Sequence, residues 1–161
     1  MSMHRPRAIA DPHDPPQRRP RMLHRRQPLR FECTQCGRCC TGGGDYYVFV
    51  NDAEAEQIHR HLGLSQSWFR RRYLARTASG ERVLASHSDG RCTFLEDDGR
   101  CRVYDARPTQ CQTYPFWPEL LRGATAWEKE RRRCEGIGHG PIVPVARIDA
   151  ALALFKEPDA G

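Results

Sequence analysis

Cysteines are the residues of this sequence whose type and spacing could do chemistry, and four of them fall within eight positions. They are Cys33, Cys36, Cys39 and Cys40, in the run Phe-Glu-Cys-Thr-Gln-Cys-Gly-Arg-Cys-Cys at residues 31–40. Two overlapping Cys-x-x-Cys units share Cys36, and each closes a short loop whose two sulfurs can converge on a metal at about 2.3 Å. Gly37 can take the positive φ that such a turn often needs. We call residues 33–40 the cysteine knuckle and predict that it binds a metal or an iron–sulfur cluster.

Four more cysteines follow the knuckle and complete a set of eight: Cys92, Cys101, Cys111 and Cys134. We expect all eight to be metal ligands. The count is compatible with two four-thiolate sites, or with one iron–sulfur cluster that uses four of them while the others are second-site ligands or core thiols. Cys33, Cys36 and Cys39 are expected to share one site. Cys40 points away from Cys39 in most backbone conformations and is expected to belong to a second site or to none.

Metal ligation is favoured over disulfide bonds because the sequence carries no export signal. The arginine pair at residues 18–19 is followed by Pro-Arg, and not by the apolar stretch of a Sec or twin-arginine signal. No run of eighteen apolar residues is present, so no transmembrane helix is expected. We therefore predict a cytoplasmic location, where thiols stay reduced and available to metals.

The composition divides the 161 residues into a basic tail and one folded domain. Residues 1–30 hold eight arginines and two aspartates, which accounts for the whole formal charge of +6 and leaves the remainder neutral. This stretch also holds six of the twelve prolines and is predicted to be disordered, whereas residues 31–161 are predicted to form a metal-binding domain. We expect contact with nucleic acid only through the tail, no contact with a membrane, and an unidentified protein partner or electron donor.

The apolar content of 39% and the mean hydropathy of −0.75 are low for a fold held by its hydrophobic core alone. Metal ligation would supply the missing organisation, as it does in other small cysteine-rich domains. The residue pattern predicts a small α+β domain of short helices and β-hairpins arranged around a metal centre.

Helices and strands are expected to begin soon after the knuckle. The aromatic and β-branched run at residues 46–50 predicts a strand. A capped helix is expected over about residues 51–62, with His59 on its surface. A second helix follows, and its Trp68 and Phe69 are expected to face the core.

A short internal repeat carries two of the distal cysteines. Residues 89–95 and 98–104 each begin with Asp-Gly-Arg-Cys and together predict a hairpin. In a regular hairpin Cys92 and Cys101 would lie roughly 10 Å apart, at about 3.3 Å per residue, too far to share one zinc ion without distortion. Further along, Phe-Trp-Pro at residues 116–118 forms an apolar patch that is expected to cover the metal side.

An ordered set of cysteine motifs gives the sequence a family resemblance. The motifs are Phe31-x-Cys33-x-x-Cys36-Gly37-x-Cys39-Cys40, Cys92-x-Phe94-Leu95, Cys101-x-Val103-Tyr104-x-x-Arg107-Pro108-x-x-Cys111, Tyr114-Pro115-Phe116-Trp117 and Cys134-x-Gly136-Ile137-Gly138. Over about residues 31–140 they resemble the YkgJ-type cysteine-cluster proteins, the zinc- or iron-chelating domain family. The resemblance implies metal or iron–sulfur binding in a bacterial protein, with zinc and iron both open. Flagellin lysine N-methylase is similar through a related cysteine cluster, which adds methyl transfer to the functions to weigh.

Three functions follow from these observations. The first is an iron–sulfur cluster protein with a redox or accessory role, and the second is a structural Zn2+ module, since closed four-cysteine zinc sites perform no chemistry. The third is a component of a methyl-transfer enzyme. A metal-free enzyme with Cys134 as nucleophile and His139 as base is disfavoured, because nearness in sequence does not make a catalytic dyad. The residues alone leave open whether the protein is an enzyme.

Overall fold

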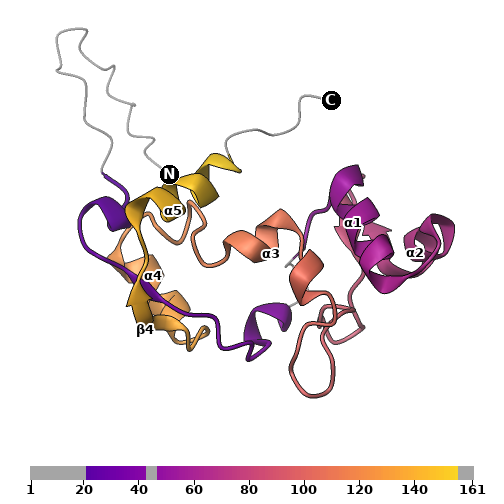
Figure 1. The fold of residues 1–161 in the computed structure, drawn as a ribbon, viewed down its shortest axis with the longest axis horizontal. Coiled ribbons are helices and arrows are strands. Elements are labelled where there is room, and N and C mark those ends of the chain that lie inside the picture. Colours follow the sequence, from indigo (N-terminus) through magenta and orange to yellow (C-terminus); the bar gives the residue numbers. More distant parts are fainter. Residues whose placement is uncertain (1–20, 43–46, 156–161) are drawn as a thin grey trace, which may run out of the picture.

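Residues 21–42 and 47–155 are described in a computed structural model of the chain, which Figure 1 draws as a ribbon. The described part holds five α-helices: α1 (Asp52–Leu62), α2 (Gln66–Tyr73), α3 (Thr109–Thr113), α4 (Ala124–Arg131) and α5 (Val145–Ala153). Its short strands are β1 (Arg30–Phe31), β2 (Leu74–Arg76), β3 (Arg82–Leu84) and β4 (Ile137–Ile142). Its 3-10 turns are η1 (Leu23–Arg25), η2 (Arg38–Cys40) and η3 (Tyr104–Ala106). The predicted α+β class is confirmed.

The elements divide between two lobes. In the terminal lobe β1 pairs antiparallel with β4, α4 packs on β4, and α5 packs on η1. In the central lobe β2 pairs antiparallel with β3, and α1 packs against both α2 and η3. Figure 1 shows the two groups on opposite sides of the molecule, with α3 between them.

Each lobe has its own hydrophobic core. In the terminal lobe, Phe116 lies between Phe31 and Trp127, with ring centroids 5.6 and 6.1 Å away. In the central lobe, Phe69 and Phe94 stack nearly parallel with centroids 6.5 Å apart. The buried residues of one core are not members of the other. The described residues therefore form two small hydrophobic cores.

Local sequence sets both ends of α1 as predicted. The Asn51 side chain accepts the Glu54 N–H at 2.8 Å, and the Glu54 carboxylate accepts the Asn51 N–H at 2.9 Å. This reciprocal capping box satisfies two donors that the first turn leaves unpaired. Gly63 ends the helix at a φ of 66°, a left-handed conformation that glycine adopts without strain.

Side chains on α1 and α2 differ from the prediction at two positions. His59, expected on the surface, is buried: its Nε2 lies 2.7 Å from the Glu56 carboxylate and its Nδ1 lies 3.0 Å from the Leu64 carbonyl. On α2, Phe69 enters the core as expected, but Trp68 stays 49% exposed. Consecutive residues on a helix point about 100° apart, so the two aromatic rings cannot face the same core.

The predicted strand before α1 and the predicted hairpin are both more irregular than expected. Residues 47–50 extend the edge of β3, since the Leu84 N–H donates to the Val48 carbonyl at 2.9 Å; residue 46 lies outside the described residues. The predicted hairpin forms around residues 96–99, where Leu95 and Cys101 make an antiparallel β-bridge and the Arg102 N–H donates to the Phe94 carbonyl at 2.8 Å. It does not extend back to Cys92, which makes its own β-bridge with Ser86.

The described end of the predicted tail belongs to the fold. Leu23 and Leu29 are 1% and 2% exposed and sit in the terminal core. The Leu23 N–H donates to the Leu121 carbonyl, and the Val143 N–H donates to the Leu29 carbonyl, each at 2.8 Å. The folded part therefore begins before the expected boundary at residue 31. Two leucines among arginines and prolines show no periodicity that could have revealed this. Residues 1–20 lie outside the described residues.

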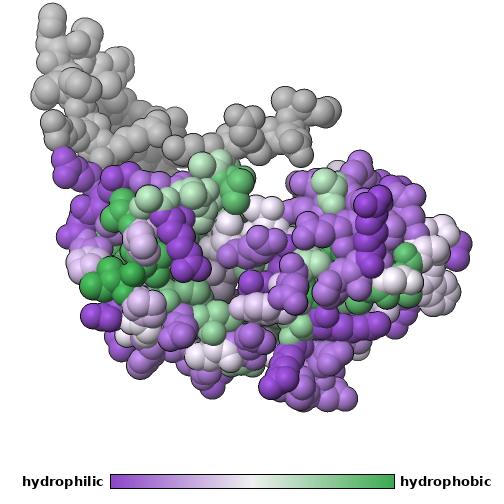
Figure 2. Space-filling view, viewed as in Figure 1, coloured by the Kyte–Doolittle hydropathy of each residue, from purple (hydrophilic) through white to green (hydrophobic). Residues whose placement is uncertain are grey.

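The surface is mostly polar. Figure 2 shows a largely hydrophilic face, with hydrophobic residues gathered over the α5 side of the terminal lobe, where Val145, Leu154 and Phe155 are exposed. None of the helices in the described ranges is both long and apolar enough to cross a membrane.

Replacement of Leu29 tests whether this segment is part of the core. Because Leu29 is 2% exposed, we expect Leu29→Ala to lower the free energy of unfolding by about 2–5 kcal/mol. Leu154→Ala is the matched control: that side chain is 59% exposed, so its loss should change stability by less than about 0.5 kcal/mol. Urea unfolding of the full chain measures both, and equal midpoints would contradict the buried position of Leu29.

The contact between η1 and α5 predicts a pH dependence of stability. The His24 Nε2 lies 2.9 Å from the Asp149 carboxylate, which also pairs with Arg25. The hydrogen bond from His24, with the nearby Arg25 charge, lowers the pKa of Asp149 below its ordinary value of 3.8. A carboxylate with a lowered folded-state pKa stabilises the fold above its unfolded-state pKa, and this contribution is lost as the pH falls through the folded-state value.

Asp149→Asn should therefore melt at a lower temperature than the wild type at neutral pH, and the difference should close in acid below the ordinary pKa of 3.8. Thermal unfolding monitored by circular dichroism across this range measures the difference. Glu119→Gln, which changes an exposed carboxylate of the same lobe, should show no such trend. A difference for Asp149→Asn that stays constant with pH would contradict the assignment.

Candidate metal centre

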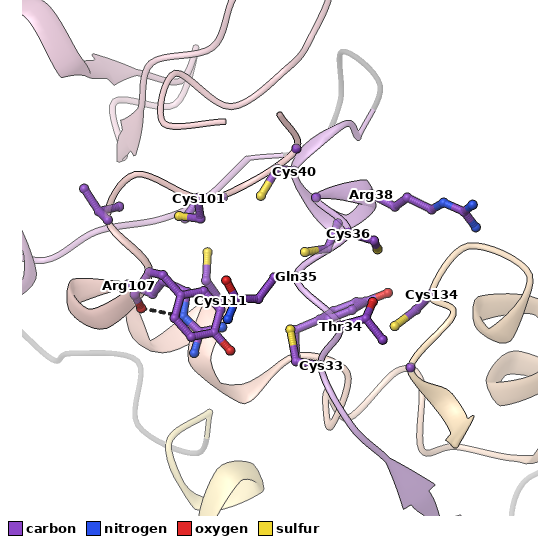
Figure 3. A pocket seen from close by; sticks show the side chains of 18 of the residues that line it. Cys33, Thr34, Gln35, Cys36, Arg38, Cys40, Cys101, Arg107, Cys111 and Cys134 are labelled. Carbon is purple, nitrogen blue, oxygen red and sulfur yellow. Dashed lines mark hydrogen bonds between the residues drawn. The ribbon is translucent and has the colours of Figure 1, made fainter. Parts of the chain in front are cut away.

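A cavity of about 80 Å3 opens between the two lobes, and cysteine is the most frequent residue type in its lining. Seven of the eight cysteines line it: Cys33, Cys36, Cys39, Cys40, Cys101, Cys111 and Cys134. Figure 3 shows sulfurs from the knuckle, from the turn that holds Cys101, from α3 and from the loop after α4 around this one space. Chain segments that are up to a hundred residues apart are thereby brought together around one cavity.

Cys92 is the one cysteine that does not line the cavity, although it lies just behind the wall. Its N–H donates to the Cys40 carbonyl at 2.8 Å, and its side chain packs against the central core. It is also near enough to Cys101 and Cys39 for charges on their sulfurs to raise its pKa. All eight cysteines thus lie at the cavity or next to it: seven line it, and Cys92 lies behind the lining residues.

The knuckle reverses direction through two residues with positive φ. Gly37 has a φ of 74° and Gln35 a φ of 56°, and the latter is a conformation that costs energy for any residue with a Cβ. Gly37 also lies hard against the central lobe, because a Cβ at this position would stand 2.3 Å from the Gly99 carbonyl oxygen. The need for glycine here is therefore both conformational and steric.

Hydrogen bonds fix each end of the knuckle to a different lobe. On the terminal side, the Glu32 N–H donates to the Gly136 carbonyl at 3.2 Å and the Thr34 hydroxyl donates to the Glu135 carboxylate at 2.6 Å. On the central side, the bond from Cys92 to the Cys40 carbonyl anchors the last residues. The knuckle is consequently bonded to both lobes at the place where they meet.

Burial favours the neutral form of four of the eight thiols. Desolvation is the main cause that raises the pKa of Cys92, Cys101, Cys111 and Cys134. A buried neutral thiol behaves as a small hydrophobic group. A metal would replace these protons, since only the thiolate is a good ligand.

Cys39 differs from these four thiols. A hydrogen bond from the Cys40 thiol, together with the Cys39 backbone N–H and the charges of Arg133 and Arg107, lowers the pKa of Cys39 to about 7. Its donor Cys40 responds in the opposite sense, because losing its proton would break this bond, and the pKa of Cys40 is raised. Cys39 therefore ionises more readily than the buried thiols of Cys101, Cys111 and Cys134.

Arg107 and Tyr104 form a rigid pair at the cavity wall that the sequence analysis did not assign to the site. The guanidinium carbon lies 3.7 Å from the centre of the Tyr104 ring, and Nε donates to the Tyr104 carbonyl at 2.8 Å. Figure 3 shows Arg107 beside Cys111, with the Gln35 side chain pointing into the same space. Arg107 thus places a fixed positive charge near several thiols. The motif Tyr-x-x-Arg-Pro was visible in the sequence, but the stacking that gives it a role was not.

Tyr114 supports the terminal side of the cavity. Its hydroxyl donates to the Glu130 carboxylate at 2.5 Å, and its ring meets Trp117 edge-on with centroids 5.1 Å apart. Trp117 and Phe116 themselves are buried behind this layer and do not line the cavity. The expectation that residues 116–118 would cover the metal side is therefore wrong, because the tyrosine two residues earlier occupies that place.

The donor set fits a metal that prefers sulfur. Cysteine is the only metal-binding residue type in the cavity lining, since no described histidine, aspartate or glutamate contributes to it. Sulfur-only donor sets select zinc, copper(I) or iron–sulfur clusters over hard cations. Within the described residues, no three side chains of the ligand types are placed so as to hold one metal ion. His139 is exposed and does not line the cavity, so it gives no support to a dyad with Cys134.

These features define a cysteine-rich α+β protein with a thiol-lined cavity where two lobes meet. Residues 32–135 match the CxxCxxCC family, whose description is "Putative zinc- or iron-chelating domain". The chain belongs to this family, which confirms the resemblance seen in the sequence and indicates cysteine-based binding of zinc or iron. The comparison with solved structures gives no match.

Gly37→Ala tests the steric demand at the knuckle. The closest neighbour of the added Cβ would be the Gly99 backbone, so we expect a loss of stability larger than the roughly 1–2 kcal/mol that a left-handed alanine costs, together with loss of bound metal. Gly63→Ala is the matched control: its φ is 66° and nothing lies within 4 Å. Denaturant unfolding and metal content measure the two variants. Equal losses of stability, with metal retained in both, would contradict the clash.

Proposed function

We propose that this protein holds an iron–sulfur cluster in the cavity and serves a redox or accessory role. The observation that carries the proposal is the single cavity of about 80 Å3 whose lining contains seven thiols. A cavity needs roughly 10–15 Å3 to accept one water molecule. The space is therefore several times larger than one small guest requires, which favours a cluster of several atoms over a single ion.

The spacing of the knuckle cysteines supports the same proposal. Cys33, Cys36 and Cys39 repeat at intervals of three, as in ferredoxin-type ligation of iron–sulfur clusters. When bound, such a cluster supplies one-electron transfer, with a potential set by net charge, hydrogen bonds and solvent exposure. Here the apolar wall lowers the local dielectric, and Arg107 would offset part of the negative charge that several thiolates bring.

Electron exchange requires an edge of the site that a partner can reach. Cys33 is exposed, and Thr34 and Gln35 beside it are exposed as well. We propose that a protein partner or electron donor approaches at this edge. Free thiols in all eight positions are expected to persist in a reducing compartment, so we also propose a cytoplasmic location.

A structural zinc module is the second candidate. The site lies at the junction of two small cores, where a closed tetrathiolate zinc site would act as a cross-link and perform no chemistry. A component of a methyl-transfer enzyme stays a third prediction, which rests on the resemblance to flagellin lysine N-methylase alone.

Anaerobic purification of the full chain separates these candidates. We expect a coloured protein with broad visible absorption, and iron and acid-labile sulfide in similar amounts. Removal of the metal by a chelator should lower the unfolding temperature, because binding energy is part of folding energy in such domains. A colourless protein with bound zinc and no sulfide would refute the iron–sulfur proposal and leave the structural module.

A further inference from the structure

We propose that the eight cysteines form two separate metal-binding sites, one on each lobe, and not a single shared centre. The terminal site comprises three thiols: Cys33, Cys36 and Cys134. The central site comprises Cys92, Cys101, Cys111 and one member of the vicinal pair Cys39 and Cys40. This inference rests on the proposed function in requiring that the thiolates bind metal. It also requires the sulfurs of each set to close around the metal on binding, because no three ligand side chains of the described residues are placed to hold one ion in this arrangement. It departs from the sequence-based expectation that Cys33, Cys36 and Cys39 share a site.

The terminal set is joined by contacts with the loop after α4. Cys134 packs against the terminal core. The residues on either side of Cys33 are bonded to the two residues that follow Cys134: Glu32 through its N–H to the Gly136 carbonyl at 3.2 Å, and Thr34 through its hydroxyl to the Glu135 carboxylate at 2.6 Å. The backbone is also tight there, since a Cβ on Gly136 would stand 2.2 Å from the Glu32 carbonyl oxygen. The first half of the knuckle is therefore held against the Cys134 turn.

The central set is joined by contacts with the other core. Cys92 and Cys101 both pack against the central core, and the bond from the Cys92 N–H to the Cys40 carbonyl, at 2.8 Å, holds the end of the knuckle beside them. The vicinal pair at residues 39–40 thus belongs with these distal cysteines by backbone contact.

Cys111 joins the central set through the anchoring of α3. The Thr109 N–H donates to the Glu54 carboxylate of α1 at 2.8 Å. The Gln110 side chain donates to the Tyr47 carbonyl at 2.9 Å and accepts the Phe49 N–H at 3.0 Å. All three bonds run to the central lobe and anchor Cys111 there, although the Trp117 indole N–H also donates to the Gln110 carbonyl at 3.0 Å from the terminal side.

Gly37 marks the division between the two sets. It has a φ of 74° and is wedged against the Gly99 carbonyl, so the chain turns there and the two halves of the knuckle leave in different directions. Figure 3 shows Cys134 on one side of the cavity and Cys101 and Cys111 on the other, with the knuckle between. The regular cysteine spacing therefore runs through Gly37, although the residues before Gly37 contact the terminal lobe and the residues after it contact the central lobe.

The two sets differ in what they can do. Four thiolates close a tetrahedral zinc site or complete the ligands of a cluster. Three thiolates leave one coordination position for water or an external ligand, which is the arrangement of catalytic sites. The three-thiol site also lies at the exposed edge of the cavity, where Cys33 and its two following residues reach solvent. Ligand exchange is therefore assigned to the terminal site and a permanent metal to the central one.

Site-resolved alkylation of single variants of the full, metal-loaded chain tests this division. In Cys33→Ser, whose position is exposed, we expect Cys36 and Cys134 to become reactive while Cys92, Cys101 and Cys111 stay protected. In Cys111→Ser we expect the reverse pattern. Metal content should fall in part in each single variant and fall fully in the double variant Cys33→Ser/Cys111→Ser.

Controls within each set make the result decisive. The double variant Cys92→Ser/Cys111→Ser should lose no more metal than Cys111→Ser alone, because both residues serve one site. At least one of Cys39→Ser and Cys40→Ser should keep the full metal content. Circular dichroism establishes folding, and Cys101→Ser replaces Cys111→Ser if the latter does not fold.

Loss of all metal and protection in every single variant would overturn the two-site division in favour of one shared centre. So would a variant of one set that exposes cysteines of the other. The identity of the metal is a separate result of the same samples: zinc without sulfide would refute the iron–sulfur proposal, while the pattern of protection would still decide between one site and two.

Discussion

The structure depends on a junction between two small hydrophobic cores that do not merge. The terminal core draws on residues from both ends of the described chain, and the central core draws on residues between them. The knuckle and α3 carry backbone and side-chain bonds to both sides. Small cores bury too little surface to hold a large interface rigid, so whatever binds the thiols at this junction contributes directly to the arrangement of the lobes.

The thiols suit this position because they can exist in two states. As neutral, buried groups they complete an apolar wall and cost little. As thiolates they need a compensating charge, which a metal supplies and which Arg107, stacked 3.7 Å from the Tyr104 ring centre, is already positioned to assist. Arginine suits this place better than lysine, because its planar group can stack on the ring and donate to the Tyr104 carbonyl at 2.8 Å at the same time. The same side chains therefore suit a buried neutral state and a metal-bound state.

The sequence predicted those features that arise from neighbouring residues. The ends of α1 follow from Asn51, Glu54 and Gly63, and the knuckle turn follows from Gly37, because each feature depends on bonds within a few residues. The pairing of β1 with β4 joins residues that are more than a hundred positions apart. No local sequence pattern predicts such a pairing. The same is true of Leu23 and Leu29, whose burial depends on partners such as Leu121 and Val143 from the far end of the chain.

The candidate site shows the same limit at the level of single thiols. Cysteine count and spacing identified the eight residues and the sulfur-only donor set, because composition is local information. Assigning them to one centre or two requires knowledge of which lobe each segment contacts. A repeat of three residues brings side chains to one face only in a regular structure, and the knuckle is not regular, since Gln35 and Gly37 both have positive φ. The first half of the knuckle is bonded to the terminal lobe, through Thr34 and Glu135. The second half is bonded to the central lobe, through Cys40 and Cys92. Cys36 and Cys39 can therefore belong to one sequence motif and still have different neighbours.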